Sequence, residues 1–247
     1  MNILINGAGG RMGRALTAMI AKGCNGAVLA GAVDPFVREE GILPSLADFE
    51  GSAHCIIDFS HPSGTKALVD FAVARKIPLV LATTGQEEEE IAMIHEAAKH
   101  IPVFFSHNMA LAAMVVGEIC KTVAAAFPDA DIEIIDYHHN RKVDVPSGTA
   151  LMIANAIKEV RPQATYNIGR PNNGKRTKEE IGIHALRVGN VVGTHEIVID
   201  AGTHAFTIRH EARDRAMFAE GAITAGLYLI KQQPGLYTMK DLLASVN

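Results

Sequence analysis

The chain has 247 residues, of which 48% are hydrophobic and 20% charged, and its formal net charge is −4 at pH 7. This composition is typical of a soluble globular protein with one large or two modest domains. It offers no basic stripe for nucleic acid, and no apolar run approaches the roughly 18 residues that a membrane span requires. The three cysteines are widely spaced without a CxxC motif, and the N-terminus does not resemble a signal peptide, so we expect reduced thiols and a cytoplasmic protein.

Short apolar runs alternate with helical patterns over the first 108 residues. The runs at 3–5, 27–33, 55–59, 78–81 and 103–105 are typical of strands buried on both faces. Between several of them, the expected helices cover residues 12–22, 63–75 and 87–99. Four glutamates open the last helix, where negative charge suits the helix dipole. This alternation predicts an α/β fold with a Rossmann-type, doubly wound parallel sheet.

The pattern changes after about residue 108. Three strand-like stretches, at 181–187, 195–200 and 204–210, follow one another without helices between them, and in the last of them apolar and polar residues alternate. We therefore expect a second, α+β domain over residues 109–215, with an open mixed sheet covered on one side. An apolar helix over residues 215–232 is expected to return to the first domain, which would comprise residues 1–108 and 216–247.

The loop at residues 167–177 is rich in glycine, asparagine and basic residues. We expect this loop to be mobile and to lie near the ligand or a neighbouring subunit.

The sequence GAGGRMG at residues 7–13 stands where the first strand would pass into the first helix. It has the spacing GxxGxxG rather than the commoner GxGxxG, because Met12 occupies the position of the third glycine. Glycines in this place allow a tight turn and a close approach of backbone amides to a pyrophosphate. Asp34, at the end of the second expected strand, can accept hydrogen bonds from ribose hydroxyls. The alternative is a glycine-rich turn with an unrelated aspartate, but the position in the chain favours a dinucleotide site.

Two further polar segments, ATTG at residues 82–85 and SHNM at residues 106–109, follow the fourth and fifth expected strands. Ligands of open α/β sheets bind at the carboxyl ends of the strands, so both segments are candidate walls of a nicotinamide pocket. Taken alone, each reads equally well as a polar loop. The predicted cofactor-binding residues are Gly7, Ala8, Gly9, Gly10, Arg11, Met12, Gly13, Asp34, Ala82, Thr83, Thr84, Ser106, His107, Asn108 and Met109.

The tetrapeptide PSGT occurs twice, at residues 62–65 and 146–149. Both copies predict the start of a helix, with a serine or threonine cap after proline. Only the second copy follows two histidines and a lysine, His138, His139 and Lys142. The two copies therefore allow a comparison between a helix start alone and a helix start that is preceded by candidate catalytic side chains.

The second copy combines the elements of an acid-catalysis site. The amides of Gly148 and Thr149 can bind an anion, and Lys142 adds a positive charge beside them. A strand over residues 131–139 would point His138 and His139 to opposite sides, so that at most one faces a ligand directly from the strand.

Simpler interpretations of the histidine pair remain open. Adjacent histidines at a strand end and a lysine in a turn are often only solvent-facing polar residues. A metal site is disfavoured because neighbouring strand residues diverge and because no cluster of cysteine, histidine or carboxylate accompanies the pair. No metal is expected.

The stretch HHNRKVDVPSGTA at residues 138–150 resembles the HHxxKxDxPSGTA signature of the 4-hydroxy-tetrahydrodipicolinate reductase (dihydrodipicolinate reductase) family. The resemblance covers essentially the whole chain, including GAGGRMG at 7–13, DFSHP at 58–62, TTG at 83–85, IGIHALR at 181–187, VGTH at 192–195 and HEARDRAMFAEG at 210–221. The sequence departs from the family pattern NMSxGVN in the hinge loop, where Ala110, Ala112 and Met114 follow Asn108 and Met109. The departure concerns the hinge and the pocket wall, not the signature.

The resemblance implies an enzyme of lysine and diaminopimelate biosynthesis that reduces 4-hydroxy-tetrahydrodipicolinate to tetrahydrodipicolinate with NADH or NADPH. It implies a Rossmann domain completed by the C-terminal helices, and a central domain for substrate binding and homotetramer contacts. His138 and Lys142 would be the catalytic proton donors. His139, Gly148 and Thr149 would hold a carboxylate of the substrate, a small dicarboxylate heterocycle.

Asp34 predicts that NADH is preferred, because the 2′-phosphate of NADPH would face its carboxylate. Arg11 and Arg38 could still approach that phosphate, so both cofactors should work. Two other functions remain open: another two-domain Rossmann amino-acid or semialdehyde dehydrogenase, and a non-catalytic dinucleotide-sensing module. The first would carry a different catalytic set, and no cysteine stands in a reactive setting. The second leaves His138 and Lys142 without a role.

Overall fold

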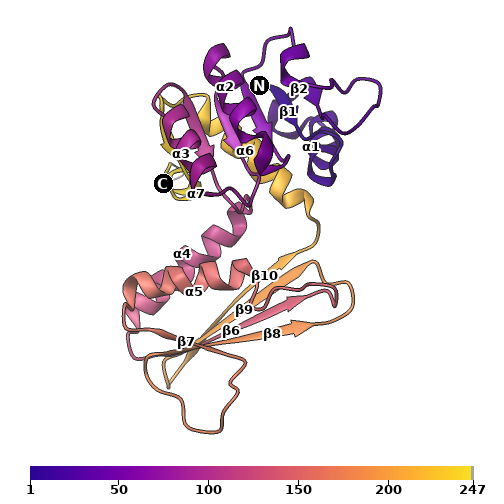
Figure 1. Ribbon diagram of the computed structural model, residues 1–247. Coiled ribbons are helices and arrows are strands. Elements are labelled where there is room, and N and C mark those ends of the chain that lie inside the picture. The colour runs from indigo at the N-terminus through magenta and orange to yellow at the C-terminus, as the bar shows by residue number, and fades with distance from the viewer. Residues whose placement is uncertain (246–247) are drawn as a thin grey trace. The chain divides into compact units, whose positions relative to one another are not determined.

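A computed structural model describes residues 1–245 of the chain (Figure 1). It divides into two compact units, one formed by residues 1–110 together with the segment that begins at Ala216, and the other by Leu111–Arg215. None of the helices in the described part combines the length and the apolarity that a bilayer crossing needs.

The first unit contains a six-stranded sheet in which every paired neighbour is parallel, in the order β11-β5-β4-β3-β1-β2. The strands are β1 (Asn2–Asn6), β2 (Val28–Val33), β3 (Cys55–Asp58), β4 (Leu79–Leu81), β5 (Pro102–Phe105) and β11 (Gly235–Tyr237). All residues of β3 and β4 are buried, as their short apolar runs predict for strands covered on both faces. The prediction of a doubly wound parallel sheet is confirmed.

The helices of the first unit are α1 (Arg11–Ala21), α2 (Thr65–Arg75), α3 (Glu88–Ala97), α6 (Ala216–Leu229) and α7 (Met239–Ala244). Three short 3-10 turns also belong to it, at Cys24–Gly26, Leu46–Asp48 and Pro62–Gly64. Helix α3 begins with a capping box in which a carboxylate oxygen of Glu90 accepts the Glu87 amide at 2.7 Å. Helix α6 is apolar on most sides and packs against α1 and three strands of the sheet, so this late segment belongs to the first core.

The second unit contains a five-stranded mixed sheet in the order β10-β9-β6-β8-β7. Strands β6, β7 and β8 pair in parallel, whereas β9 runs antiparallel to both β6 and β10. Helices α4 and α5 lie side by side along one face of this sheet (Figure 1). The elements are α4 (Leu111–Ala126), β6 (Asp131–His138), α5 (Gly148–Val160), β7 (Thr165–Ile168), β8 (Glu180–Arg187), β9 (Gly193–Asp200) and β10 (Ala205–Ala212).

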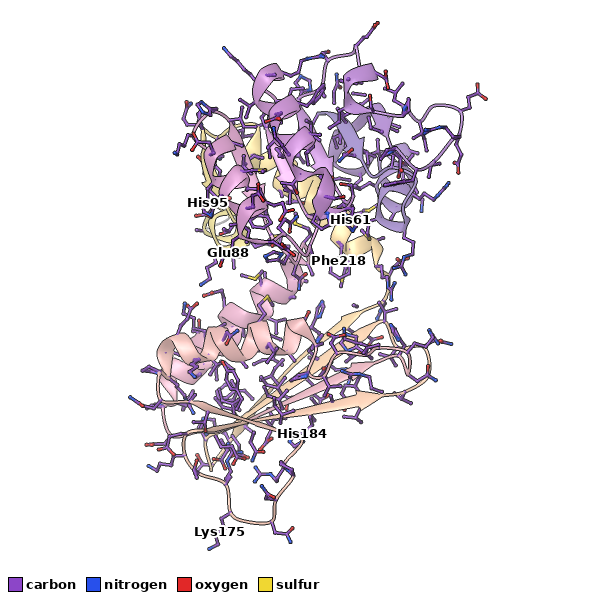
Figure 2. All side chains as sticks on the ribbon, viewed as in Figure 1. His61, Glu88, His95, Lys175, His184 and Phe218 are labelled. Carbon is purple, nitrogen blue, oxygen red and sulfur yellow. The ribbon has the colours of Figure 1, made fainter. Side chains whose placement is uncertain are left out.

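Only one face of the second sheet is covered by helices. Along β6, Ile132 and Ile134 are fully buried against α4 and α5, whereas the alternate residues Glu133 and Ile135 are half-buried. Figure 2 shows His184 of β8 on the side away from the helices, where its ring contacts the Glu133 carboxylate at 2.9 Å. The expectation of an open mixed sheet covered on one side is confirmed.

Some boundaries differ from the expected ones for local reasons. The helix expected over residues 63–75 opens with the 3-10 turn Pro62–Gly64, and α-helical structure begins only at Thr65. Strands β7 and β11 were not predicted, because short segments lacking an apolar run carry little periodic signal.

Strand β7 extends into the expected loop 167–177, and two arginines of that loop pair with the sheet. The guanidinium of Arg176 contacts a Glu133 carboxylate oxygen at 2.7 Å, and Arg170 pairs with Glu180. Lys175 lies at the tip of the loop (Figure 2). Part of the basic character of the loop is thus used in ion pairs with its own sheet.

Candidate active site

The glycine loop joins β1 to α1 at the carboxyl edge of the parallel sheet. Gly7 has φ +80°, and a Cβ there would lie 2.6 Å from the carbonyl oxygen of Phe59. A Cβ at Gly13 would lie 2.2 Å from the carbonyl oxygen of Gly7. Both positions therefore require glycine, and together they bring the start of α1 close against the loop. The glycine loop thus leads directly into a helix N-terminus, an arrangement that suits the pyrophosphate of a dinucleotide.

Asp34 directly follows β2 and is anchored beside this loop. Its two carboxylate oxygens accept backbone amides, Oδ2 from Gly9 at 3.0 Å and Oδ1 from Phe36 at 2.9 Å. A carboxylate has about four acceptor positions, so two remain for the hydroxyls of a ribose. The structure thus brings Asp34 and the glycine loop together, as a dinucleotide site requires.

The two arginines considered for a 2′-phosphate are placed differently. Arg11 is exposed at the start of α1. Arg38 is turned toward its own segment, where its guanidinium donates to the carbonyl oxygen of Pro35 at 3.1 Å. A third arginine, Arg14, was not anticipated; it donates to the Gly9 carbonyl oxygen at 3.0 Å and pairs with Glu39.

A buried carboxylate, Asp58, ties three loops together at the same edge of the sheet. Its Oδ1 accepts the side chains of Asn6 at 2.7 Å and Ser60 at 2.6 Å, and its Oδ2 accepts the Thr83 hydroxyl at 2.6 Å. The Thr83 hydroxyl accepts in turn from the Ser60 amide at 2.8 Å. Burial raises the pKa of Asp58, although the hydrogen bonds from Ser60, Thr83 and Asn6 oppose the shift. The cluster fixes Thr83, a predicted cofactor residue, beside the end of β1.

The remaining predicted cofactor residues lie after β4 and β5. Ala82 is buried and Thr84 is exposed. After β5, the Ser106 hydroxyl donates to the carbonyl oxygen of Asn108 at 2.8 Å, and the His107 ring packs edge-on against Phe105. Met109 is buried.

The segment that departs from the family pattern is well packed. Met109 and Ala110 are each 2% exposed, and the Ala110 amide donates to the side-chain oxygen of Asn108 at 2.9 Å. A Cβ on Gly221 of α6 would lie 1.8 Å from the Met109 carbonyl oxygen, so α6 crosses this segment in close contact.

The two PSGT copies fold differently. In the first, the N-cap is His61 rather than a serine or threonine: its Nδ1 accepts the Ser63 amide at 3.2 Å, so our cap assignment was wrong there. In the second, Ser147 is the N-cap, as expected, and its hydroxyl oxygen accepts the Ala150 amide at 3.2 Å. Helix α5 starts at Gly148, which is exposed and where an added Cβ would meet nothing within 4 Å. The second copy therefore presents an open helix N-terminus suited to an anion.

His138 is held by a carboxylate that the sequence did not single out. The Nδ1 atom of His138 lies 2.5 Å from Oδ1 of Asp136, two residues earlier on β6 and completely buried. Oδ2 of the same carboxylate accepts the Ser147 amide at 2.7 Å and lies 3.4 Å from the Arg187 guanidinium. The signal available in the sequence was the spacing: alternate residues of a strand share a face.

Burial alone would raise the pKa of Asp136. The hydrogen bonds from His138 and the Ser147 amide, with the charges of His138 and His195, outweigh it and lower this pKa to about 2. The carboxylate is therefore ionised at neutral pH.

His195 of β9 completes the cluster under the helices. Its Nε2 lies 3.1 Å from the Ser147 hydroxyl, and its ring packs edge-on against His138. Burial lowers the pKa of His195 to about 4, against the charge of Asp136, so the ring is neutral at pH 7.

Contrary to the expectation from the sequence, a carboxylate and a third histidine do accompany the histidine pair. Asp136, His138 and His195 lie with potential ligand atoms within 4.8 Å of one another. The contact between Asp136 and His138 is nevertheless a hydrogen bond of 2.5 Å. A zinc ion at about 2.0–2.2 Å from each ligand atom would need those two atoms further apart.

Lys142 and His139 lie in the turn that follows β6. The Lys142 ammonium contacts the Asp144 carboxylate at 2.8 Å, which lowers the pKa of Asp144. Burial lowers the pKa of His139, and the charges of Arg141 and Arg215 add to this shift. The Arg215 guanidinium lies 3.4 Å from His139 Nε2, so a second cation stands beside the predicted carboxylate site.

Two family models match the chain, and they meet near residue 110, where the first unit passes into the second. The model described as dihydrodipicolinate reductase, N-terminus, matches residues 1–109, and the model described as its C-terminus matches residues 112–243. The chain belongs to the dihydrodipicolinate reductase family.

Individual relatives agree with this assignment. A 4-hydroxy-tetrahydrodipicolinate reductase from Caldanaerobacter subterraneus subsp. tengcongensis is 41% identical over 245 residues, which cover 98% of each chain. One from Clostridium tetani is 38% identical over 250 residues, covering 99% of this chain and 98% of the relative. A solved dipicolinate-bound dihydrodipicolinate reductase from Paenisporosarcina sp. TG-14 has the same fold, with a TM-score of 0.79 at 23% identity over 96% of this chain and 97% of the other.

Proposed function

We propose that this protein is an NAD(P)H-dependent 4-hydroxy-tetrahydrodipicolinate reductase of lysine and diaminopimelate biosynthesis. The relatives in this family that match nearly the full length of the chain carry the name 4-hydroxy-tetrahydrodipicolinate reductase. The observation that carries the proposal is the second PSGT copy, where His138 and Lys142 stand next to an open helix N-terminus. A proton donor beside an anion site is what the reduction of a cyclic dicarboxylate needs.

The first unit holds the cofactor in this proposal, through the glycine loop, Asp34 and the polar ends of β4 and β5. The reduced nicotinamide supplies the hydride. The residues present fit the group: the glycine loop leads into the N-terminus of α1, and the Asp34 carboxylate is held beside that loop by the amides of Gly9 and Phe36.

The second unit holds the substrate and supplies the proton. The first-turn amides of α5, at Gly148 and Thr149, with the His139 side chain, bind one carboxylate. Lys142 and Arg215 add positive charge around it. The proton comes from His138 Nε2, because Nδ1 is engaged with Asp136, or from the Lys142 ammonium. A heterocyclic dicarboxylate fits this site; the name of the Paenisporosarcina relative's bound ligand, dipicolinate, describes such a compound.

We infer that both cofactors serve, with NADH preferred. Asp34 is held by two amides in a fixed position, where a 2′-phosphate would meet a like charge. Arg38 donates to backbone oxygens of its own segment and would have to leave them to reach a phosphate.

We also propose that four copies of the chain assemble through the helix-free face of the second sheet. On this face, apolar residues such as Ile135, Val198 and Leu186, the last 41% exposed, alternate with charged ones. Such a half-apolar sheet face is suited to burial against another copy. The free thiols Cys24, Cys55 and Cys120 suit the reducing cytoplasm, where we expect the enzyme to act.

A semialdehyde dehydrogenase is disfavoured because it needs a reactive cysteine. Burial raises the pKa of both Cys55 and Cys120 to about 12, so neither is a thiolate at neutral pH. Cys24 follows α1, at the amino edge of the parallel sheet, away from the cofactor loops. A dinucleotide sensor without turnover remains distinguishable by experiment.

The test feeds the purified protein the product of dihydrodipicolinate synthase and follows the absorbance of reduced nicotinamide. Oxidation of NADH or NADPH well above a blank without the synthase product is expected. Cofactor binding without oxidation would favour the sensor. Oxidation with an amino-acid or semialdehyde substrate, but not with the synthase product, would favour the other dehydrogenases.

A further inference from the structure

The buried carboxylate of Asp136 connects the two parts of the substrate site. Its Oδ1 lies 2.5 Å from His138 Nδ1, and its Oδ2 accepts the amide of Ser147, the N-cap of α5, at 2.7 Å. The Arg187 guanidinium, 3.4 Å from Oδ2, also donates to the Asp144 carbonyl oxygen at 2.8 Å and so joins the lysine-bearing turn to the same centre. The residue is fully buried and is not a part of the family signature quoted above.

We propose that Asp136 is the positioning residue of the reduction. It fixes the ring of His138 so that Nε2 delivers the proton, and it holds the start of α5 at a set distance from that ring. The inference rests on the proposed function, in which His138 donates a proton to the substrate.

The choice of ring nitrogen follows from the hydrogen bond. An ionised carboxylate only accepts, so Nδ1 of His138 carries a hydrogen in both the neutral and the charged ring. The transferable proton is therefore on Nε2, and after transfer the ring keeps its tautomer and orientation. A Cβ on Gly193 would lie 3.0 Å from Nε2, so a side chain at that position would crowd the donating atom.

Within residues 1–245, apart from the contact between the two, the contacts of the His138 ring and of the Asp136 carboxylate are with groups that carry no negative charge of their own. His195 faces the ring from β9, Arg187 approaches the carboxylate from β8, and His139 and Lys142 stand in the following turn. All of these groups are cationic or neutral, as is His210, which stacks beyond His195. The carboxylate of Asp144, which lies in the same turn, is paired with the Lys142 ammonium. Without Asp136, a charged His138 ring would face only neutral groups and like charges.

Replacement by asparagine disturbs both contacts. The amide has one oxygen and one NH₂ group, so it can accept from His138 or from Ser147 in the present geometry, but not from both. If the oxygen faces Ser147, the NH₂ group donates to Nδ1 and the neutral ring must move its hydrogen to Nε2, which reverses the tautomer. If the oxygen faces His138, two donors meet at the start of α5.

The test is a double-mutant cycle of Asp136→Asn and His138→Gln, with kcat measured against pH. Alone, Asp136→Asn should lower kcat between about tenfold and a thousandfold, within the usual worth of general acid catalysis. The basic limb of its kcat profile should move to lower pH, since the ring then gives up its proton more readily. In the His138→Gln background the same change should alter kcat by less than about threefold, because it acts through the ring that is missing.

Three further measurements exclude a merely structural effect. Asp136→Glu keeps a carboxylate and should recover part of the kcat lost in Asp136→Asn, with the wild-type form of the pH profile. A downfield proton resonance from the short hydrogen bond at His138 Nδ1 should be present in the wild type and absent from both Asp136→Asn and His138→Gln. The control is Asp129→Asn, in the same unit at a side chain 80% exposed, which removes one negative charge and should leave kcat and the pH profile unchanged.

Two outcomes overturn the inference while leaving the proposed function intact. One is a wild-type enzyme that turns over, with an Asp136→Asn variant of unchanged kcat and pH profile. The other is an equal loss from Asp136→Asn in both backgrounds. If Asp136→Asn does not fold, Asp136→Glu is the deciding variant. A shifted pH profile of kcat in this variant, despite the retained carboxylate, contradicts the proposal. A wild-type protein without turnover removes the proposed function and this inference with it.

Discussion

The pKa values of two buried aspartates, one in each unit, are shifted in opposite directions. Asp58 is 1% exposed and Asp136 is completely buried, and each accepts at least two short hydrogen bonds. The donors to Asp58 are neutral side chains, and burial raises the pKa of Asp58 in spite of them. The donors to Asp136 include the His138 ring, and its pKa falls to about 2 although burial alone would raise it. At Asp136 the hydrogen bonds from the His138 ring and the Ser147 amide, with the charges of His138 and His195, outweigh burial, whereas at Asp58 the neutral donors do not.

The two candidate sites around these carboxylates differ in the same way, in the charge of the groups that form them. The candidate cofactor site is built from backbone amides, glycines and neutral side chains, with Asp34 as its fixed charge. The candidate substrate site is built from an ionised carboxylate, three histidines and several cations. Changes in the first unit should therefore act on cofactor binding or stability, and changes in the second on kcat and substrate binding.

The largest effect should come from His138→Gln. We expect kcat to fall by roughly two to four orders of magnitude, the usual worth of general acid catalysis, with a smaller change in the KM for substrate. The dissociation constant of NADH should stay within about twofold of wild type, because the change lies in the substrate unit. Turnover within a few-fold of wild type would assign the proton to another donor, with Lys142 the first to test.

The next effect concerns the choice of cofactor, measured as KM for NADH and NADPH at saturating substrate. Wild type should prefer NADH by up to about one to two decades, since one charged contact is worth roughly 1–3 kcal/mol. Asp34→Ser should narrow or invert this gap. The companion variant Arg38→Ala should weaken NADPH alone if Arg38 leaves the carbonyl oxygen of Pro35 to meet the phosphate. A wild-type preference for NADPH would show that an arginine outweighs Asp34.

Much of the fold could be predicted from the sequence because most of its strands have a recognisable hydrophobic pattern. The runs that became β1, β3 and β4 are largely apolar, as is typical of strands buried on both faces, with Asp58 at the end of β3 as the exception. Strand β10 could be recognised by its alternation, since only one of its faces is covered. Strand β11 could not, because its three half-buried residues carry no pattern and depend on pairing with β5.

The residues of the candidate site could be predicted where they belong to a local sequence motif. They could not be predicted where strand pairing brings together residues that are far apart in the sequence. Glycines at positions 7 and 13 are locally required, and the sequence reveals them. Asp136 and His195 meet only because β6 and β9 pair in one register, with Asp136 opposite His195. Nothing in the one-dimensional spacing of Asp136 and His195 indicates that contact, so the expectation that no cluster accompanies the histidine pair was wrong.

A smaller effect separates the two PSGT copies. Thr149→Val keeps the backbone amide but removes a hydroxyl from the proposed carboxylate site, and it should raise the KM for substrate by up to about tenfold, the worth of one hydrogen bond to a charged group or slightly less. Thr65→Val, at the buried start of α2, should leave the substrate KM unchanged and instead lower the free energy of unfolding. Equal changes in substrate KM would mean that the histidines and the lysine before the second copy do not distinguish it.

The smallest effect returns to the two aspartates and tests the sign of their shifts. The raised pKa of Asp58 means that the stability it contributes is present below its ordinary value of 3.8 and is lost as pH rises through the folded-state pKa. The lowered pKa of Asp136 means that its contribution is present above 3.8 and is lost as pH falls toward about 2. Asp58→Asn should therefore change the free energy of unfolding at pH 7 by no more than about 1 kcal/mol, since an amide can still accept from Asn6 and Ser60 while its NH₂ faces the Thr83 hydroxyl.

The measurement is urea unfolding of wild type, Asp58→Asn and Asp136→Asn between pH 2.5 and 7, values chosen to bracket the ordinary aspartate pKa of about 3.9. Relative to wild type, Asp58→Asn should gain stability as pH rises, because it no longer carries a buried carboxylate that must ionise without a cation. As pH rises through the lower part of the same range, Asp136→Asn should lose stability relative to wild type. The reason is that wild type gains the stabilising charge of Asp136 as it ionises, and the variant does not. Differences of the same sign would show that the two carboxylates share one environment, and the contrast between their hydrogen-bond donors would then fail as the explanation.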